Sequence, residues 1–231
     1  MEGIGKRFDE ERLLSARTKT WDAVSLIAES VRPGQTESEA IKRANSILAD
    51  MGVRRFWHRT HIRFGRNTIL GYEDSYDAEV NLAEDDIFYV DIGPVFDDHE
   101  GDAGTTFVLG GDPEKLALQR DARVIFERTQ DQWLRENTNG PALYEYASKI
   151  AQELGWLLNP PYVRGHRISD VPHSIHHGGS LQEFGEHPRA ERWVLEIQIR
   201  HPTKDLGAFH EDILLRREKE KESPPPKRAN A

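Results

Sequence analysis

Two aspartates interrupt apolar stretches of the sequence where an isolated charge would be costly to bury. Asp91 follows the run Ile87–Val90, and Asp102 lies eleven positions later (102 − 91 = 11), just before the stretch that contains Phe107. Two strands joined by a polar, glycine-bearing loop would form a hairpin with one carboxylate on each strand. Each carboxylate needs a partner, because a lone buried charge is strongly unfavourable. A single aspartate of this kind usually makes an ion pair or caps a turn, but two together favour a shared cation.

Imidazoles and further carboxylates follow in the second half of the chain. His166 and His173 are seven residues apart, Glu196 lies inside the strand-like run Val194–Ile199, and Glu211 opens the last apolar segment. Each is weak evidence alone, since a glutamate on the solvent face of a strand is common. As a set, these residues offer the hard oxygen and imidazole ligands that suit Mn, Co, Fe or Zn. We therefore predict a site for two divalent metal ions with the ligands Asp91, Asp102, His166, Glu196 and Glu211.

The composition excludes several other kinds of site and partner. Cysteine is absent from the 231 residues, so any metal must be bound by carboxylates and imidazoles. The formal charge of -9 would repel a phosphate backbone, and we expect no nucleic-acid partner. The charged N-terminus lacks the apolar stretch of a secretory signal, and no apolar run is long enough to span a bilayer. We expect a cytoplasmic protein with no membrane partner.

The spacing of apolar residues predicts two groups of helices and two groups of strands. Helical periodicity with capping and stop signals predicts helices at residues 9–31, 37–51, 112–136 and 140–155. Apolar runs between Val53 and Gly110 predict three or four strands, and short strands follow the last helix. The order helix, helix, strands, helix, helix, strands indicates two similar halves and a mixed fold with a largely antiparallel sheet.

The C-terminal segment differs in composition from the rest. Residues 216–231 carry mixed charge and three consecutive prolines, with no large apolar side chain. Such a segment cannot bury enough surface to offset its ordering entropy. We expect a single domain over residues 1–215 and a disordered tail over residues 216–231.

The two aspartates resemble a motif of the methionine aminopeptidase, prolidase and creatinase family, the pita-bread metallohydrolases. In that family an Asp-x-Gly strand is followed eleven positions later by a second Asp that precedes a Thr-Phe pair. Here the matching residues are Asp91, Gly93, Asp102 and Thr106–Phe107.

The later residues match the same family in the same order. Its Gly-His motif corresponds to His166, which lies 64 positions after Asp102 (166 − 102 = 64), and its second histidine, seven further on, corresponds to His173. Its two closing glutamates correspond to Glu196 and Glu211. The resemblance covers residues 10–215 and implies an α+β pita-bread fold. That fold is a curved, mostly antiparallel sheet with helices on its outer face and two pseudo-symmetric halves.

The resemblance also implies a role for each ligand. Asp91 would chelate one ion, Asp102 and Glu211 would bridge both ions, and His166 and Glu196 would complete the other. A hydroxide that bridges the ions would attack a small amide or peptide C–N bond, as in other paired-metal hydrolases. The expected substrate is a small molecule or short peptide, and a homodimer is expected by analogy with the family.

Two residues would assist the reaction directly. Glu196 would relay a proton to the leaving group. His173 would bind the substrate and hydrogen-bond the developing oxyanion.

The sequence departs from the family beside the first histidine. A small residue usually stands where this chain has Arg167, which would either fork onto a substrate carboxylate or point outward and pair with Asp170. Glu196 is followed by Ile197 in place of the usual proline, and Glu211 comes only 15 residues later (211 − 196 = 15). Less loop is therefore available to cover a substrate.

A second departure concerns the histidine that positions substrates in the family's peptidases, because this chain has Gly71 at the aligned position. His58 and His61 lie upstream and are candidates to replace it, although a lone histidine on an amphipathic strand is more often structural or exposed. His176 and His177 are interpreted as outer or solvent-facing groups. These departures leave the ligand set intact and bring the peptidase reaction into question.

Three functions fit the residues. The first is a metal-dependent hydrolase that resembles aminopeptidases and Xaa-Pro peptidases. The second uses the same metal site for a non-peptide substrate, as creatinase-like hydrolases and lyases do. The third is a non-catalytic binding module, which the intact ligand set disfavours. A fold alone does not decide between them.

Overall fold

An antiparallel sheet lined by α-helices forms the part of the chain that the computed structural model describes, residues 2–173 and 179–216. The α-helices are α1 (Glu10–Ser30), α2 (Glu37–Asp50), α3 (Pro113–Arg135) and α4 (Gly140–Glu153). The strands are β1 (Phe56–Phe64), β2 (Asp86–Phe96), β3 (His99–Glu100), β4 (Ala103–Leu109), β5 (Leu157–Leu158), β6 (His166–Arg167), β7 (Trp193–Arg200) and β8 (Gly207–Ile213). Short 3-10 helices cover Gly65–Ile69 (η1) and Leu181–Glu183 (η3).

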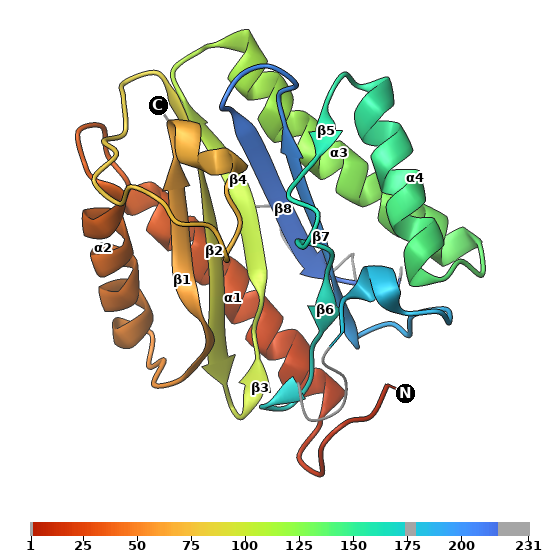
Figure 1. Cartoon of the computed structure of the whole chain (residues 1–231). Helices are drawn as coiled ribbons and strands as arrows, with labels where there is room; N and C mark the ends of the chain where they lie inside the picture. Colours follow the sequence, from red (N-terminus) through yellow and green to blue (C-terminus); the bar gives the residue numbers. More distant parts are fainter. Residues whose placement is uncertain (1, 174–178, 217–231) are drawn as a thin grey trace.

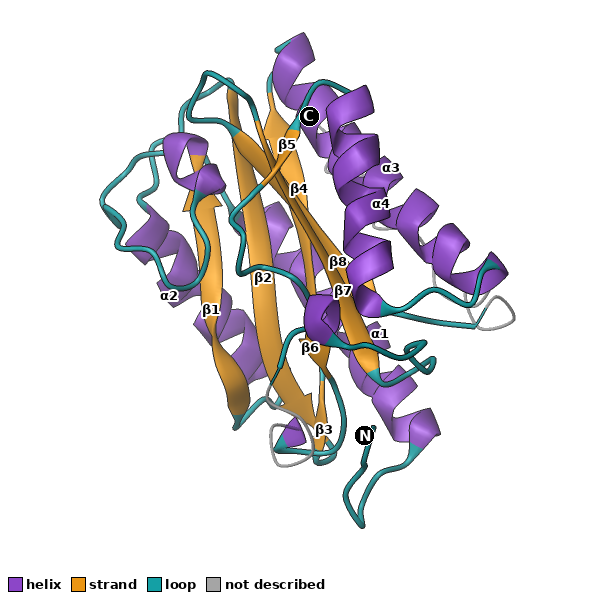
Figure 2. Ribbon diagram, turned by 45° about the vertical axis from the view of Figure 1, so that its right-hand side comes forward, coloured by secondary structure: helices purple, strands orange, loops and turns teal. Residues whose placement is uncertain are grey.

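The sheet joins strands that are far apart in the sequence. Its strand order is β1-β2-β4-β8-β7-β5, with β3 paired to β2 and β6 paired to β7. The helices lie behind the sheet in Figure 1, α1 and α2 behind β1 and β2, and α3 and α4 beside β7 and β8. Figure 2 shows that the curved sheet leaves its other face free of α-helices. The predicted α+β fold with a curved antiparallel sheet is confirmed.

Two separate hydrophobic cores support the two halves. In one, residues of α1 and α2 such as Val24 and Leu48 pack on Ile62 and Val90 of the first strands. In the other, residues of α3 and α4 pack on β7 and β8. The repeated arrangement agrees with the two similar halves expected from the order of elements.

Capping signals in the sequence place the helix starts. Asp9, Asp112 and Asn139 accept hydrogen bonds from backbone amides in the first turn of α1, α3 and α4, and Thr36 with Glu39 forms a capping box on α2. These side chains satisfy amides that otherwise lack partners at a helix start. All four predicted helices form within two residues of the expected bounds.

The predicted C-terminal tail lies almost wholly outside the described residues. Arg216 is described, and its Nε lies 3.4 Å from a carboxylate oxygen of the buried Glu191. Residues 217–231, and also His176 and His177, lie outside the described residues. Among the helices that the structure describes, none is long and apolar enough to cross a membrane.

A buried ion pair connects α1 to β8. Arg17 donates to Asp212 through Nε at 2.7 Å and through a terminal guanidinium nitrogen at 2.5 Å. The indole nitrogen of Trp21 donates to the same carboxylate at 3.0 Å. Both charged side chains are at least nine-tenths buried. Because Asp212 follows Glu211 directly, this pair also fixes the backbone of a predicted metal ligand.

Replacing Arg17 should therefore destabilise the fold strongly. In the Arg17→Met variant the buried Asp212 loses its cation, and we expect the free energy of unfolding to fall by about 3–5 kcal/mol. Urea unfolding of the metal-free protein measures the change. Arg12→Met, at an exposed position of the same helix, is the control and should change stability by less than about 0.5 kcal/mol. A loss below about 1 kcal/mol for Arg17→Met would contradict the assigned role.

Candidate metal centre

Strand pairing aligns the ligand candidates in a row across the sheet. His61 is paired with Asp91, Asp91 with Gly104, Gly104 with Glu211, and Glu211 with Glu196. Residues at paired positions of neighbouring strands lie side by side on the same face. The row therefore brings three predicted ligands from β2, β8 and β7 together, although 120 positions separate Asp91 from Glu211 (211 − 91 = 120).

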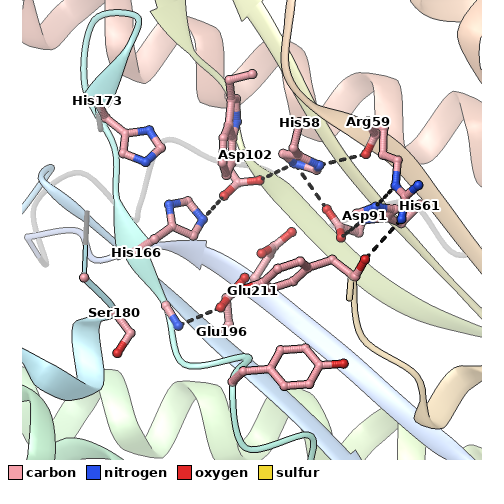
Figure 3. A pocket seen from close by; sticks show the side chains of 15 residues that line it. His58, Arg59, His61, Asp91, Asp102, His166, His173, Ser180, Glu196 and Glu211 are labelled. Atoms are coloured by element: carbon pink, nitrogen blue, oxygen red, sulfur yellow. Dashed lines mark hydrogen bonds and ion pairs between the residues drawn. The ribbon is translucent and has the colours of Figure 1, made fainter. Parts of the chain in front are cut away.

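The other two predicted ligands lie beside this row. Asp102 stands immediately before β4, and His166 lies on β6, which pairs with β7 at Val194. The Nε2 atom of His166 is 2.8 Å from Oδ2 of Asp102. All five predicted ligands line one pocket of about 530 Å³ on the open face of the sheet (Figure 3). That volume is in the range of sites for small ligands.

The loop before His166 orients Glu196. The backbone amide of Gly165 donates to Oε2 of Glu196 at 2.6 Å. Gly165 has a φ of +68°, in the left-handed region that glycine adopts without strain, and an added Cβ would lie 2.4 Å from the carbonyl oxygen of Val194. The glycine of the Gly-His motif is thus required by both its backbone conformation and its close contact with β7.

Clustering of buried carboxylates sets the electrostatics of the pocket. The pKa of Glu211 is raised well above its ordinary value by burial and by the negative charges of Asp102, Asp91 and Glu196. Burial also raises the pKa of Glu196, partly offset by the charge of His166. Without a bound cation, Glu211 therefore binds a proton more readily than an exposed glutamate does.

The imidazoles beside these carboxylates are correspondingly basic. Burial alone would lower the pKa of His166, but its contact with Asp102 and the charges of Asp102 and Glu196 raise it to about 9. The opposite shift occurs at Asp91, where burial is outweighed by His58 and His61 and the pKa falls to about 2. The carboxylates of the pocket thus already favour the positively charged form of the neighbouring imidazoles.

The residues of the pocket fit divalent cations. Oε1 of Glu211 is buried and accepts no hydrogen bond from any described residue, and the buried Oδ2 of Asp102 lies 2.8 Å from Nε2 of His166. Such buried oxygens are unfavourable unless a cation satisfies them. Asp102, His166 and Glu211 each offer one ligand atom, and these atoms lie within 4.8 Å of one another. Carboxylate oxygen with imidazole nitrogen suits Mn, Co, Fe or Zn.

His58 and His61 both line this pocket, so they stay candidates to replace the histidine that is absent at position 71. Nδ1 of His61 is 3.0 Å from Asp91, and Nε2 of His58 is 3.2 Å from Asp102. These two histidines and Asp91 form a second group whose ligand atoms lie within 4.8 Å of one another. Two histidines three residues apart before the Asp-x-Gly strand were the available signal.

His173 lines the pocket as predicted, and an unpredicted residue holds it. Glu100 accepts from Nδ1 of His173 at 2.7 Å and from its backbone amide at 3.0 Å. The ring of His173 stacks on that of His166, with centroids 5.4 Å apart. Glu100 is almost fully buried. Its position two residues before Asp102 was the only sequence signal for this role.

Neither interpretation of Arg167 is correct. Its side chain is fully buried outside the pocket lining, and it donates to the backbone carbonyls of Arg192 at 2.7 Å and Gly3 at 2.6 Å. It therefore contacts neither the pocket nor Asp170, because β6 turns it to the face opposite His166. Among the described residues, the arginine that lines the pocket is Arg59.

The absence of a histidine at position 71 has a steric reason. A Cβ built on Gly71 would lie 2.7 Å from the ring of Tyr162 and 2.9 Å from Pro160. Tyr162 and Tyr72 line this side of the pocket. A histidine at position 71 would therefore displace the pocket wall, which two tyrosines form instead.

Metal affinity should rise with pH. The metal-free protein holds a proton on His166, whose pKa is about 9, and the raised pKa of Glu211 favours protonation there too, so a cation must displace protons. We expect Co²⁺ affinity to increase from about pH 6 to about pH 9 and to level off above it. Calorimetric titration in two buffers of different ionisation enthalpy counts the released protons. A pH-independent affinity with no proton release would contradict this expectation.

The sequence and the fold of this chain are similar to those of known proteins. The model of metallopeptidase family M24 matches residues 11–212. The prolidase from Pyrococcus horikoshii is 19% identical with a TM-score of 0.71, over 91% of this chain and 59% of that chain. The prolidase from Pyrococcus furiosus is 21% identical with a TM-score of 0.69, over 91% of this chain and 61% of that chain. The methionine aminopeptidase from Thermotoga maritima is 16% identical with a TM-score of 0.68, over 93% of this chain and 98% of that chain.

These likenesses establish the fold, and the chain spans about three fifths of the length of the two prolidases. No curated protein matches the sequence significantly. The predicted pita-bread fold and the predicted family are confirmed. The match over residues 11–212 shows that the chain belongs to metallopeptidase family M24.

Proposed function

We propose that this protein is a hydrolase that uses two divalent metal ions to cleave a C–N bond in a short peptide or small amide. The observation that carries the proposal is a pair of buried carboxylate oxygens: Oε1 of Glu211, which accepts no hydrogen bond from any described residue, and Oδ2 of Asp102, which lies 2.8 Å from Nε2 of His166. They lie in a pocket together with Asp91, Glu196 and His166. Asp91 would bind one ion, Asp102 and Glu211 both, and His166 and Glu196 the other. Paired divalent ions, when bound, supply an activated water nucleophile and polarise the substrate carbonyl.

Glu196 is suited to carry a proton during the reaction. One of its oxygens is fixed by the amide of Gly165, so the carboxyl group has a defined orientation in the pocket. Burial raises its pKa, which makes proton uptake near neutral pH easier than for an exposed glutamate. We infer that Glu196 takes a proton from the attacking water and delivers it to the leaving nitrogen.

His173 is suited to bind the substrate oxygen. Because Nδ1 donates to Glu100, the nitrogen that remains for a ligand is Nε2. The ring is further held between His166 and Trp57, with centroid distances of 5.4 and 5.1 Å. A preorganised donor of this kind stabilises charge that develops on a carbonyl oxygen. This supports the oxyanion role expected of His173.

Arg59 gives the pocket a site for a substrate carboxylate. Its Nε donates to His61 at 3.1 Å and one terminal nitrogen donates to the carbonyl of Tyr72 at 3.1 Å. These bonds use two of the five N–H groups of the guanidinium and hold it at the pocket, so other N–H groups can bind a ligand. A short peptide with a free C-terminus therefore fits better than a neutral amide.

Metal loading followed by a substrate panel tests the proposal. The panel contains dipeptides, N-terminal methionine peptides, Xaa-Pro dipeptides and small non-peptide amides. Asp102→Ala should lower kcat/KM on any substrate found by at least about a thousandfold, equivalent to about 4 kcal/mol. Unchanged activity in that variant would overturn the two-metal mechanism. Cleavage of non-peptide amides alone would instead favour the creatinase-like alternative.

Substrates with a free carboxylate should depend on Arg59. In the Arg59→Met variant, loss of a charge-assisted hydrogen bond of about 1.5–3 kcal/mol should lower kcat/KM for free dipeptides by about tenfold to a hundredfold. The matching C-terminal amides should change much less, so the ratio of the two is the measured quantity. Arg66→Met, at an exposed ion pair with Asp77, is the control. An unchanged ratio would exclude carboxylate recognition by Arg59.

Homodimer formation and a cytoplasmic location stay predictions.

A further inference from the structure

His58 holds the same position on one side of Asp102 that the predicted ligand His166 holds on the other. Nε2 of His58 is 3.2 Å from Oδ1 of Asp102, and Nε2 of His166 is 2.8 Å from Oδ2 (Figure 3). We infer that His58 is a sixth metal ligand, on the side of Asp91, so that each of the two ions is bound by one imidazole. The inference rests on the proposed two-metal function and adds a ligand to it.

The two histidines are oriented by the same kind of bond. Nδ1 of His58 donates to the carbonyl of Arg59 at 2.8 Å, and Nδ1 of His166 donates to the carbonyl of Arg167 at 2.7 Å. A carbonyl oxygen only accepts, so Nδ1 carries the proton and the lone pair of the neutral ring is on Nε2. Metal-binding histidines are typically held in this way. In both residues Nε2 faces the carboxylates, and Nε2 of His58 donates to Oδ1 of Asp102 at 3.2 Å. A cation that displaces this proton would meet the lone pair of Nε2.

The distances around His58 fit a shared ion. Its Nε2 is 3.2 Å from Asp102 Oδ1 and 3.5 Å from Asp91 Oδ1. Two ligands of one ion, with bonds of about 2.0–2.2 Å at angles near 90–110°, are roughly 2.9–3.5 Å apart. His58 therefore lies where a ligand of the ion held by Asp91 is expected.

The backbone around His58 makes room for this position. His58 is paired with Gly93, and a Cβ built on Gly93 would lie 2.1 Å from the imidazole of His58. The pairing of β1 with β2 is irregular between His58 and His61. In a regular strand, residues three apart point to opposite faces, so the irregularity lets both rings face Asp91.

His61 and His173 also line the pocket outside the predicted ligand set, but neither is placed as His58 is. Arg59 donates to Nε2 of His61 at 3.1 Å, so Nδ1 of the neutral ring carries the proton that it donates to Asp91 at 3.0 Å. His61 is therefore a positioning residue for Asp91. His173 is held by Glu100, and neither group of close ligand atoms among the described residues includes it. Of these three histidines, His58 is the one whose Nε2 lies next to the carboxylates of both Asp91 and Asp102.

A second imidazole has a consequence for the choice of metal. Imidazole nitrogen favours Zn, Co and Ni more than Mn or Mg, which prefer oxygen ligands. With one nitrogen on each ion, both positions should prefer Zn²⁺ or Co²⁺ to Mn²⁺.

Pulsed EPR of the Mn²⁺-loaded protein tests the inference, because it counts the histidine nitrogens coupled to manganese. Selective ¹⁵N labelling of histidine assigns the signals. The wild-type protein with two bound ions should show two coupled imidazoles, and His58→Ala and His166→Ala should each show one. His173→Ala, which removes an imidazole from the same pocket, is the control and should keep both.

Calorimetric titration with Mn²⁺ provides an independent readout. His58→Ala should weaken one of the two ions by at least about 10- to 100-fold, the cost of removing even an outer-shell partner. Two bound ions with one coupled imidazole in the wild type would overturn this inference alone. Failure of the wild type to bind two ions would overturn the proposed function as well. The number of imidazoles coupled to manganese in the wild-type protein tests the inference even where a variant does not fold.

Discussion

Four carboxylates buried in one pocket are the constraint on which the rest of the structure depends. Asp91, Asp102, Glu196 and Glu211 repel one another in a place where water screens them little. Without a cation, this repulsion raises the pKa of Glu211, and the imidazoles beside the acids supply positive charge. Carboxylates that repel one another in the absence of a cation gain the most free energy when divalent cations bind between them. The conformation of Gly165 and the buried Arg17 both serve to hold it in place.

Local features of this chain could be predicted well from the sequence. Each helix start is determined by a side chain within three residues of the amide that it caps, as at Asp9 and Asp112. The strands that carry Asp91 and Glu196 were identified by their apolar runs, and the spacing of the ligands indicated the family. These signals depend on neighbours in the chain, so they are visible without the fold.

The parts that could not be predicted depend on pairing between distant strands. His58 and His61 face the pocket because β1 pairs irregularly with β2, and nothing in residues 56–64 alone indicates this. Glu100 meets His173 across 73 positions (173 − 100 = 73), and Arg167 turns away from the pocket because of its place on β6. A periodicity argument shows that a residue alternates with its neighbours, but not which face is the open one.

The pairing of β4 with β8 affects the order in which the parts of the protein fold. These central strands are joined at Gly104 and Glu211, positions separated by more than a hundred residues, and they connect the two halves of the sheet. Contacts between distant segments close long loops and form slowly compared with helices and hairpins. The hairpin that carries Asp91 and Asp102 is local, whereas Glu211 reaches it only when the second half docks. Metal ions therefore have a complete set of ligands only at the end of folding, and the halves alone offer incomplete sites.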